Sequence, residues 1–465
     1  MCKISPVSKQ FLTIFCCNLL TFSFGMATGW ATINFNELQS ENCTFPTGPL
    51  SLEEASLVVS LLNIGGFFGN WITLLMNNIF GIKRTIHLFG VPLILSALLI
   101  IWAQNVYYVY VSRVLSGLVG GGVSVGIATL IQDISHDSMR GALNSLYDPM
   151  NNLGIIISFF LGNNLNWLDQ VTAQLIAPII FMIIMFLIPE SPEYLTNRNK
   201  DKRAIKAHKF YKGSAAALEH AEFLQKLKDE KVEKGMSDND ENQTEMELNT
   251  KISLRDFCTP HAKRAYFISF VGLILSFLTG SMLILGYVTD IFTKTGSSLS
   301  PKNSSLLVSV VQIIANCIFL YIVERVNRRT LQISSSILTT ISFFLFAIYC
   351  SFWINQPNYD WMPTTLFTCI VLFSWLGLIP IPFIITIEIF PKKIRHTCLA
   401  LAISLFWIVF FILGMIFPIF LETYGLFNCM LTLGTLCVVN LLFGIFFIPE
   451  TRGKSYDEIM KLMVL

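Results

Sequence analysis

The stretch Ile188-Pro189-Glu190-Ser191 closes one long apolar run, and Ile448-Pro449-Glu450-Thr451 closes another 260 residues later. Other landmarks recur at similar offsets: Asp133 and Arg140 return as Glu388 and Arg395 after 255 residues, and Gly81-Ile82-Lys83-Arg84 returns as Asn327-Arg328-Arg329 after about 245. Because these landmarks keep one order and nearly one offset, the chain is predicted to contain two copies of one unit.

The composition is typical of a membrane protein. Of the 465 residues, 62 are charged, or 13%, whereas an ordinary soluble domain has about 25%. Hydrophobic residues make up 53% of the chain and the mean hydropathy is +0.61. Residues 191–262 hold 26 of the 62 charges, so one polar linker separates two apolar blocks. The net charge of +2 argues against a nucleic-acid partner, which requires a basic surface.

A bilayer core of about 30 Å needs roughly 20 apolar residues in a helix. Runs of that length predict an all-α integral membrane protein with twelve transmembrane helices in two six-helix halves. We expect the N-terminal half at 1–190, a cytoplasmic linker at 191–262, the C-terminal half at 263–448 and a cytoplasmic tail at 449–465. The predicted spans are 11–33, 55–76, 86–104, 107–132, 143–162, 170–189, 265–290, 304–323, 331–353, 364–390, 397–420 and 426–448.

The basic residues predict the orientation. With both termini in the cytoplasm, 29 of the 32 Lys and Arg fall on cytoplasmic segments or adjoining helix ends, as the positive-inside rule requires. The sequons at Asn42 and Asn303 then lie outside, where N-glycans are added. Within the linker, Leu218, Ala221 and Leu224 recur at helical spacing, which predicts short amphipathic helices; residues 237–249 show no such pattern and are expected to be disordered.

No residue pattern predicts catalysis. The 11 cysteines are scattered, and no C-x-x-C pair or His/Cys group has the spacing of a metal site. No nucleophile–base pair is evident. We therefore expect no metal, no cofactor and no enzymatic activity.

Membrane folds built from two six-helix repeats are typical of secondary transporters, with the substrate site between the halves. Acids and arginines at the cytoplasmic helix ends can bridge the halves when the inner gate is shut, and opening would break those pairs. The alternative is that these charges only anchor helix ends in head groups, which explains the basic residues but not the acids. The predicted gating residues are Asp133, Arg140, Glu190, Glu324, Arg328, Arg329, Glu388, Arg395 and Glu450.

Several motifs resemble the sugar porter family of the major facilitator superfamily over nearly the whole chain. Pro189-Glu190-Ser191-Pro192-Glu193-Tyr194-Leu195 looks like the family's PESPRYL, and Pro449-Glu450-Thr451-Arg452-Gly453-Lys454 looks like its PETKG. Glu324-Arg325-Val326-Asn327-Arg328-Arg329 is similar to its ERxGRR. The short loop after the first span looks most like the insect facilitated trehalose transporters. The resemblance implies a uniporter in the plasma membrane that carries a small sugar, trehalose or a hexose such as glucose, and that works as a monomer.

The resemblance also assigns a sugar pocket, in which several family residues are replaced. Asp148 stands for a glutamine, Ser276 and Phe277 for a glutamine pair, Met282 and Gln312 for asparagines, and Phe383 for a tryptophan, while Trp407 is retained. Lost amides remove hydrogen-bond partners for sugar hydroxyls. Two alternatives therefore stay open: a sensor that binds ligand without transport, and a proton-coupled carrier of another polar solute.

The proton-coupled alternative depends on Asp148, which would be the titrating group. It lies eight residues after Arg140, about 12 Å along a continuous helix and so near mid-membrane. A carboxylate there is expected to bind substrate or a proton, or to pair with a neighbouring Tyr or Asn. Arg113 is expected to bind backbone carbonyls or Asp148, since Ala27 stands where proton-coupled relatives have an aspartate. That replacement favours passive transport.

Overall fold

The computed structural model describes residues 5–41, 48–135, 137–198, 200–214, 218, 221–222, 259–354, 356–390, 394–452, 454 and 458–459. All regular elements within these ranges are helical. The N-terminal half contains α1 (Pro6–Gln39), α2 (Leu52–Phe80), α3 (Ile82–Leu88), α4 (Gly90–Ile101), α5 (Val106–Ile134), α6 (Asp137–Asn144), α7 (Tyr147–Asn164), α8 (Trp167–Gln174) and α9 (Ile176–Met185).

The C-terminal half repeats this order after the linker helices α10 (Pro192–Asn197) and α11 (Asp201–Tyr211). It consists of α15 (Pro260–Tyr266), η1 (Phe267–Val271), α16 (Gly272–Leu278), η2 (Leu283–Tyr287), α17 (Val288–Thr295), α18 (Pro301–Ile322), α19 (Arg328–Phe352), η3 (Pro357–Tyr359), α20 (Met362–Phe373), η4 (Ser374–Leu378), α21 (Pro380–Ile389) and α22 (Arg395–Phe446).

The twelve predicted spans are confirmed. Ten helical segments are long and apolar enough to cross a membrane. One of them, α22, contains two spans, because its backbone turns at Gly425 (φ 76°). The remaining span is α7. It is less apolar than the ten other segments because it contains Asp148 and four asparagines.

The helices begin where the sequence supplies caps. At the start of α2, the Ser51 hydroxyl accepts the Glu54 N–H and the Glu54 carboxylate accepts the Ser51 N–H, which satisfies two N–H groups that lack helical partners. Ser5, Thr259 and Ser300 cap α1, α15 and α18 in a similar way, each followed by a proline in the first turn. The local sequence therefore sets these helix starts.

Glycines let the helices of the N-terminal half pack closely. A Cβ on Gly117 of α5 would overlap the Leu62 carbonyl of α2, and one on Gly65 would overlap the Val114 carbonyl of α5. Close backbone approach through small residues is the usual packing device in lipid. The glycines therefore let the backbones of α2 and α5 approach closely.

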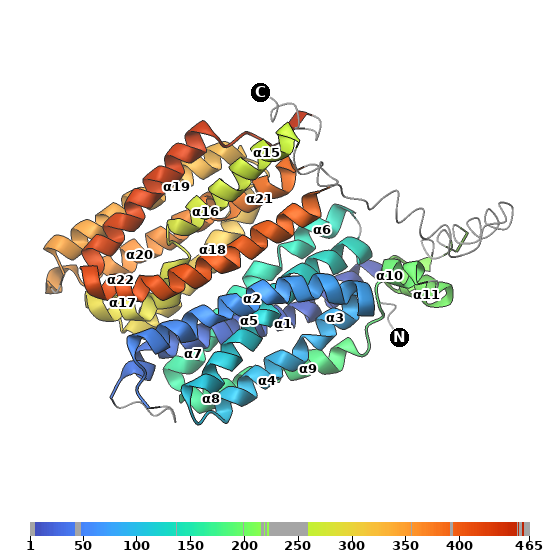
Figure 1. Ribbon diagram of the computed structural model, residues 1–465, viewed down its shortest axis with the longest axis horizontal. Coiled ribbons are helices and arrows are strands. Elements are labelled where there is room, and N and C mark those ends of the chain that lie inside the picture. Colours follow the sequence, from blue (N-terminus) through green and yellow to red (C-terminus); the bar gives the residue numbers. More distant parts are fainter. Residues whose placement is uncertain are drawn as a thin grey trace.

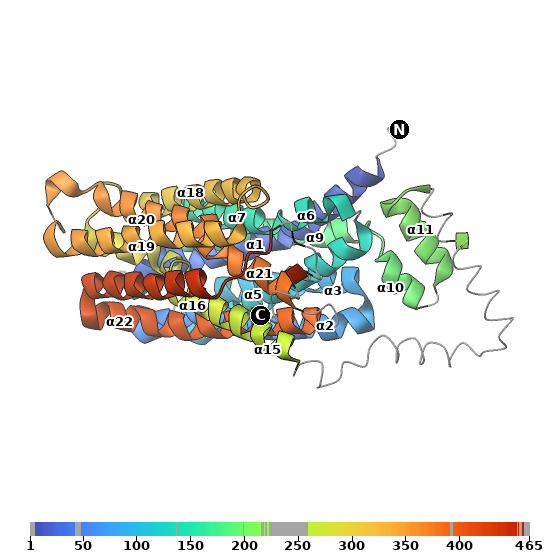
Figure 2. The same cartoon turned by 90° about the horizontal axis from the view of Figure 1, so that it is seen from above.

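The two halves lie side by side, with the N-terminal half in blue to green and the C-terminal half in yellow to red (Figure 1). Both views place α10 and α11 at one end of the molecule (Figures 1 and 2). We call this end the linker end. The opposite end, which carries α17 and the turn of α22 at Gly425, is called the far end.

Part of the linker packs on the first helix. The Gln10 side chain donates to the Tyr211 carbonyl over 2.8 Å, and the Tyr211 hydroxyl donates to the Pro189 carbonyl over 2.8 Å. Leu218 and Ala221 are helical, as expected, whereas Leu224 and residues 237–249 lie outside the described residues. The domain boundaries stay predictions.

Candidate substrate pathway between the two halves

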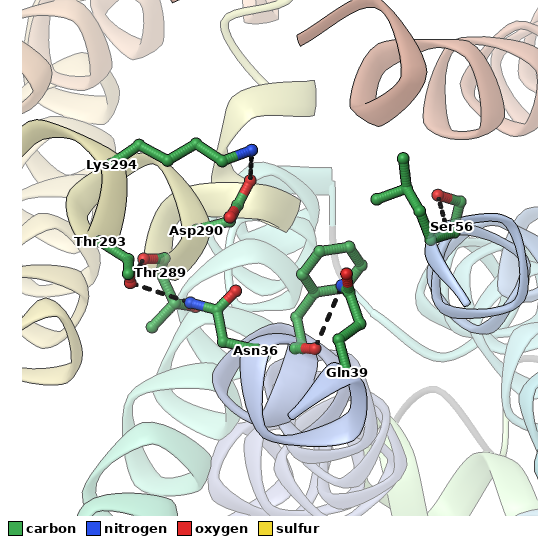
Figure 3. A network of polar contacts seen from close by, with 9 residues as sticks. Asn36, Gln39, Ser56, Thr289, Asp290, Thr293 and Lys294 are labelled. Atoms are coloured by element: carbon green, nitrogen blue, oxygen red, sulfur yellow. Dashed lines mark hydrogen bonds and ion pairs between the residues drawn. The ribbon is translucent and has the colours of Figure 1, made fainter. Parts of the chain in front are cut away.

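Helices α1 and α17 join the halves at the far end. The Thr289 hydroxyl donates to the Thr32 carbonyl over 2.5 Å. The Asn36 amide donates to the Thr293 hydroxyl over 2.9 Å (Figure 3). Both pairs are 257 residues apart, within the range of offsets that relates the two sequence copies. A separation in this range is expected where positions related by the duplication face each other across a two-fold axis.

Aromatic and charged residues complete this contact. The Tyr287 ring packs on Phe35 at 5.2 Å and on Phe417 at 5.4 Å, and its hydroxyl donates to the Gly414 carbonyl. Beside it, Lys294 and Asp290 form an ion pair of 3.1 Å on α17 (Figure 3). The halves are therefore held together at the far end.

Two further helix pairs connect the halves. At the α2–α22 interface, a Cβ on Gly66 would overlap the Trp407 ring, and the Asn70 amide donates to the Ala400 carbonyl and the Ser404 hydroxyl, both over 3.2 Å. This interface extends from the far end, where Gly414 lies on Ser60, to Asn70.

The α7–α18 interface is hydrogen-bonded only near the far end, as far as the described residues show. The Asn163 amide donates to the Asn303 side-chain oxygen over 3.0 Å, and the Lys302 ammonium donates to the Gly162 carbonyl over 2.9 Å. Hydrogen bonds of the α2–α22 interface thus extend toward the linker end as far as Asn70, whereas those found in the α7–α18 interface lie near the far end.

The structure brings the predicted aromatic residues together. Phe277 lies 5.8 Å from Phe383, and both contact Phe406, at 5.1 and 6.1 Å. Trp407 lies 4.9 Å from Phe406. These rings form one cluster in the C-terminal half, and Trp407 places its edge against the N-terminal half.

The predicted polar residues fall in different places. Ser276 is buried and accepts a hydrogen bond of 3.0 Å from Asn440, so its hydroxyl is used inside the C-terminal half. Met282 is half-buried just before η2. Gln312 is only 5% exposed, yet its amide makes no hydrogen bond with any described residue. Among these three, Gln312 is therefore the side chain with free hydrogen-bonding capacity.

Three buried donors lack partners, and sequence reasoning had named only one of their residues, Trp407. Trp407 Nε1, Trp375 Nε1 and Asn316 Nδ2 have no hydrogen-bond partner in the described structure. Their side chains are 7%, 7% and 6% exposed. Unsatisfied buried donors are costly, so these groups are candidates for ligand or inter-half contacts. Asn316 could have been found, since it lies four residues after Gln312 and so on the same helix face.

Trp375 sits in the π-helical turn η4. The Ser335 hydroxyl of α19 donates to the Phe373 carbonyl over 2.6 Å and accepts the Leu378 N–H over 2.7 Å. The Ser335 hydroxyl thus binds a backbone carbonyl and a backbone N–H at the π-helical turn. Such turns are frequent at functional sites, but their sequences carry no clear signal.

Asp148 lies in the first turn of α7, after a break at Ser145 and Leu146. Pro149 has no N–H to continue the ladder, which accounts for the break. The expectation of one continuous helix from Arg140 was therefore wrong. The Asp148 side chain is accessible to solvent although protein surrounds it, and it has no hydrogen-bond or ion-pair partner among the described residues.

Arg113 is buried and donates to two backbone carbonyls, Val58 over 2.8 Å and Ala27 over 2.5 Å. The prediction that Arg113 binds carbonyls is confirmed. Asp148 is not its partner.

The predicted gating acids of the N-terminal half are paired within that half. The Ser191 hydroxyl donates to Asp133 over 2.5 Å. Glu190 accepts the backbone N–H groups of Lys83 and Arg84 over 2.8 and 3.3 Å. Burial raises the pKa of the Glu190 carboxyl, while these N–H groups act against that shift. Arg140 donates to the Gln132 carbonyl over 3.0 Å.

The C-terminal half repeats this arrangement. Glu450 accepts the backbone N–H groups of Arg328 and Arg329 over 3.2 and 3.1 Å. The Arg328 guanidinium lies 3.0 Å from Glu388 and 3.9 Å from the exposed Glu324. The Arg395 side chain lies outside the described residues. Ion pairs between described residues do not join the halves at the linker end.

Comparison with known proteins identifies the family. The family model "Sugar (and other) transporter" matches residues 13–463. The chain belongs to this family. This chain is 28% identical to a facilitated trehalose transporter of Bombyx mori over 467 aligned positions. The alignment covers 98% of this chain and 89% of that protein. It is 27% identical to the facilitated trehalose transporter of Culex quinquefasciatus, covering 98% and 87%.

Solved structures of other transporters share the fold of this chain. The inward-open conformation of the xylose transporter XylE from E. coli superposes with a TM-score of 0.75 at 18% identity, over 97% of this chain and 99% of that one. XylE bound to 6-bromo-6-deoxy-D-glucose superposes with a TM-score of 0.71 at 19% identity, over 99% and 100%. The twelve-helix major facilitator fold is therefore confirmed.

Proposed function

We propose that the protein is a facilitative transporter that moves a small sugar, trehalose or a hexose such as glucose, across the plasma membrane. The observation that carries this proposal is the similarity, over 98% of the chain, to proteins named facilitated trehalose transporters. The aromatic cluster fits a sugar, because aromatic rings pack on the apolar faces of pyranose rings. The free donors of Gln312 and Trp407 supply hydrogen bonds for hydroxyl groups, each worth about 1 kcal/mol.

Passive transport is supported by the surroundings of Arg113. Its guanidinium is occupied by the Val58 and Ala27 carbonyls, and Ala27 has no carboxylate that could carry a proton beside it. A sugar moved down its own gradient needs no coupled ion. The maximal uptake rate is then expected to be independent of the proton gradient.

Transport proceeds by alternating access, with the linker end in the cytoplasm and the far end outside. The far-end contacts of Thr32, Asn36, Thr289 and Thr293 close the outer side. The acids Asp133 and Glu388, with Arg140 and Arg395, bridge the halves when the linker end closes. The helix ends at the linker end are also held by five further charged residues: Glu190, Glu324, Arg328, Arg329 and Glu450. A single chain is sufficient, and Asn42 and Asn303 carry N-glycans on the outer side.

Uptake of radiolabelled trehalose and glucose into Xenopus oocytes tests the proposal. Oocytes that show the protein at their surface should take up at least one of the two sugars faster than water-injected oocytes. The variant Phe277→Ala, which removes one ring of the cluster, is expected to raise the KM. Phe352→Ala, an exposed ring remote from the cluster, serves as the control. Absence of uptake at confirmed surface expression contradicts the proposal.

A second candidate, a proton-coupled carrier of another polar solute, is favoured by the unpaired carboxylate of Asp148. In that case Asp148→Gln removes the pH dependence of uptake. If wild-type uptake does not change when the outer pH is lowered from about 7.5 to about 5.5, this candidate is excluded.

A further inference from the structure

Two polar groups on facing helices of the α7–α18 interface lack partners. Asp148 on α7 is a carboxylate without a hydrogen bond or ion pair in the described structure. Asn316 on α18 is 6% exposed, and its Nδ2 donor is buried without an acceptor. A buried donor and an accessible carboxylate are complementary, and a hydrogen bond to a charged acceptor is among the stronger ones in proteins.

The register of the two helices places these residues at the same depth. The helices run antiparallel, and the contact between Lys302 and Gly162 fixes their alignment near the far end. Asp148 lies fourteen residues before Gly162, and Asn316 lies fourteen residues after Lys302. Fourteen residues are about four helical turns, roughly 21 Å. Both residues therefore lie at about the same depth on two neighbouring helices.

The duplication of the chain points to neighbouring positions on the same two helices. In the other interface, Asn70 of α2 donates to Ser404 of α22. The structure relates Lys83 to Arg328, since each offers its N–H to a glutamate, and this gives an offset of 245 for the α2 and α18 region. The sequence copies give 255 for the α7 and α22 region. Adding 245 to position 70 gives position 315, which is next to Asn316. Subtracting 255 from position 404 gives position 149, which is next to Asp148.

We propose that Asp148 and Asn316 form a hydrogen bond between the halves that closes the linker end of the α7–α18 interface. Each of its two residues lies one position from the counterpart of a residue in the Asn70–Ser404 bond, which is already made. In the present structure the far-end contacts hold and the Asp148–Asn316 bond is open. When α7 and α18 approach at the linker end, the Asn316 N–H donates to the Asp148 carboxylate, and the buried Asn316 donor gains the acceptor that it lacks. This proposal rests on the alternating access of the proposed function but not on the identity of the solute.

Disulfide trapping tests whether the two positions approach each other. The full chain would carry Asp148→Cys and Asn316→Cys together with Cys317→Ser, and a protease site within residues 237–249 would report whether the halves are joined after cleavage. The pair Asn163→Cys and Asn303→Cys is the positive control, because these side chains are in contact. The pair Asp148→Cys and Gln312→Cys, one helical turn away, is the matched negative control. We expect the 148/316 pair to cross-link at least tenfold faster than this control; no cross-link beside a positive control that forms overturns the proposal.

Pulsed electron resonance tests the energetic coupling without any solute. Spin labels on p-acetylphenylalanine at the exposed positions Asn78 and Thr330 would report the separation of the halves at the linker end. Asp148→Ala and Asn316→Ala should each shift the ratio of closed to open molecules about tenfold toward open, and the double variant should shift it no further. The exchange of the two residues, Asp148→Asn with Asn316→Asp, should restore the wild-type ratio. Additive single effects, unchanged single variants, or an exchanged variant that is folded but not restored would each overturn the proposal.

Since the label distances do not depend on transport, a protein that carries no sugar would still show this coupling. Conversely, sugar uptake with additive effects of Asp148→Ala and Asn316→Ala would leave the proposed function intact and remove this inference.

Discussion

Glu190 and Glu450 occupy equivalent positions in the two halves, and each accepts two successive backbone N–H groups at the start of a helix. Glu190 binds the first turn of α3, and Glu450 binds the first turn of α19. These N–H groups have no partner within their helices, and the positive end of each helix dipole favours a carboxylate. Each glutamate therefore ties the end of the sixth or last span to a helix start in its own half.

Glu450→Ala should lower the stability of the protein by about 1–2 kcal/mol, because two charge-assisted hydrogen bonds to the start of α19 are lost. The midpoint of thermal unfolding, measured on the detergent-purified protein by size-exclusion fluorescence, should fall by a few degrees. Glu324→Ala is the control, since the Glu324 carboxylate is 77% exposed and lies 3.9 Å from its cation. Equal losses in both variants would contradict the capping role.

Gly117→Ala should destabilise the N-terminal half strongly. The added Cβ would overlap the Leu62 carbonyl, and backbone cannot move aside as a side chain can, so a cost of about 1–3 kcal/mol or more is expected. Gly141→Ala is a matched control, because nothing lies within 4 Å of its Cβ position. The yield of folded protein in detergent should fall only for Gly117→Ala; a normal yield would show that α2 and α5 can separate without cost.

Trp407→Phe removes the unpaired Nε1–H and keeps an aromatic ring. If this donor binds a sugar hydroxyl, the KM for uptake should rise about fivefold, as expected for one hydrogen bond of about 1 kcal/mol. The maximal rate should change little. Trp102→Phe, which alters an exposed tryptophan, should leave both constants unchanged. An unaltered KM in Trp407→Phe would mean that the indole N–H does not contact substrate.

Thr289→Val keeps the shape of the side chain and removes its bond to the Thr32 carbonyl. Because this bond holds the far end closed, the variant should favour conformations open at that end. A cysteine introduced at Asn36 should then react faster with a membrane-impermeant maleimide from outside, by about fivefold. Thr423→Val, on an exposed part of α22, should not change the rate. If the two valine variants react alike, the far-end bond has no part in gating.

The sequence predicted the twelve spans because length and apolarity alone define a transmembrane helix. For Arg113 it predicted either backbone carbonyls or Asp148 as partners, and the structure shows the carbonyls of Val58 and Ala27. It did not indicate the partner of Ser276, because the phase of a helix does not say which neighbour a polar side chain meets; Asn440 lies 164 residues away. Trp375 was missed because its π-helical turn depends on Ser335 of another helix.

The gating residues illustrate the same limit at the linker end. Their sequence positions indicated charged helix ends, and the structure places Arg328 beside Glu388 within one half. Whether such groups bridge the halves depends on the distance between two rigid bodies, which no local pattern encodes. The bridging role of Asp133, Arg140, Glu388 and Arg395 stays a prediction.

The contact of Thr32 with Thr289, and of Asn36 with Thr293, has a consequence for ancestry. Positions that descend from one residue touch only if they lie on the symmetry axis, and a surface on such an axis is complementary to itself. A single six-helix unit could therefore have assembled with an identical copy through this surface before gene fusion. After such a fusion each side of the contact is free to change alone, and an asparagine, Asn36, now lies opposite a threonine, Thr293.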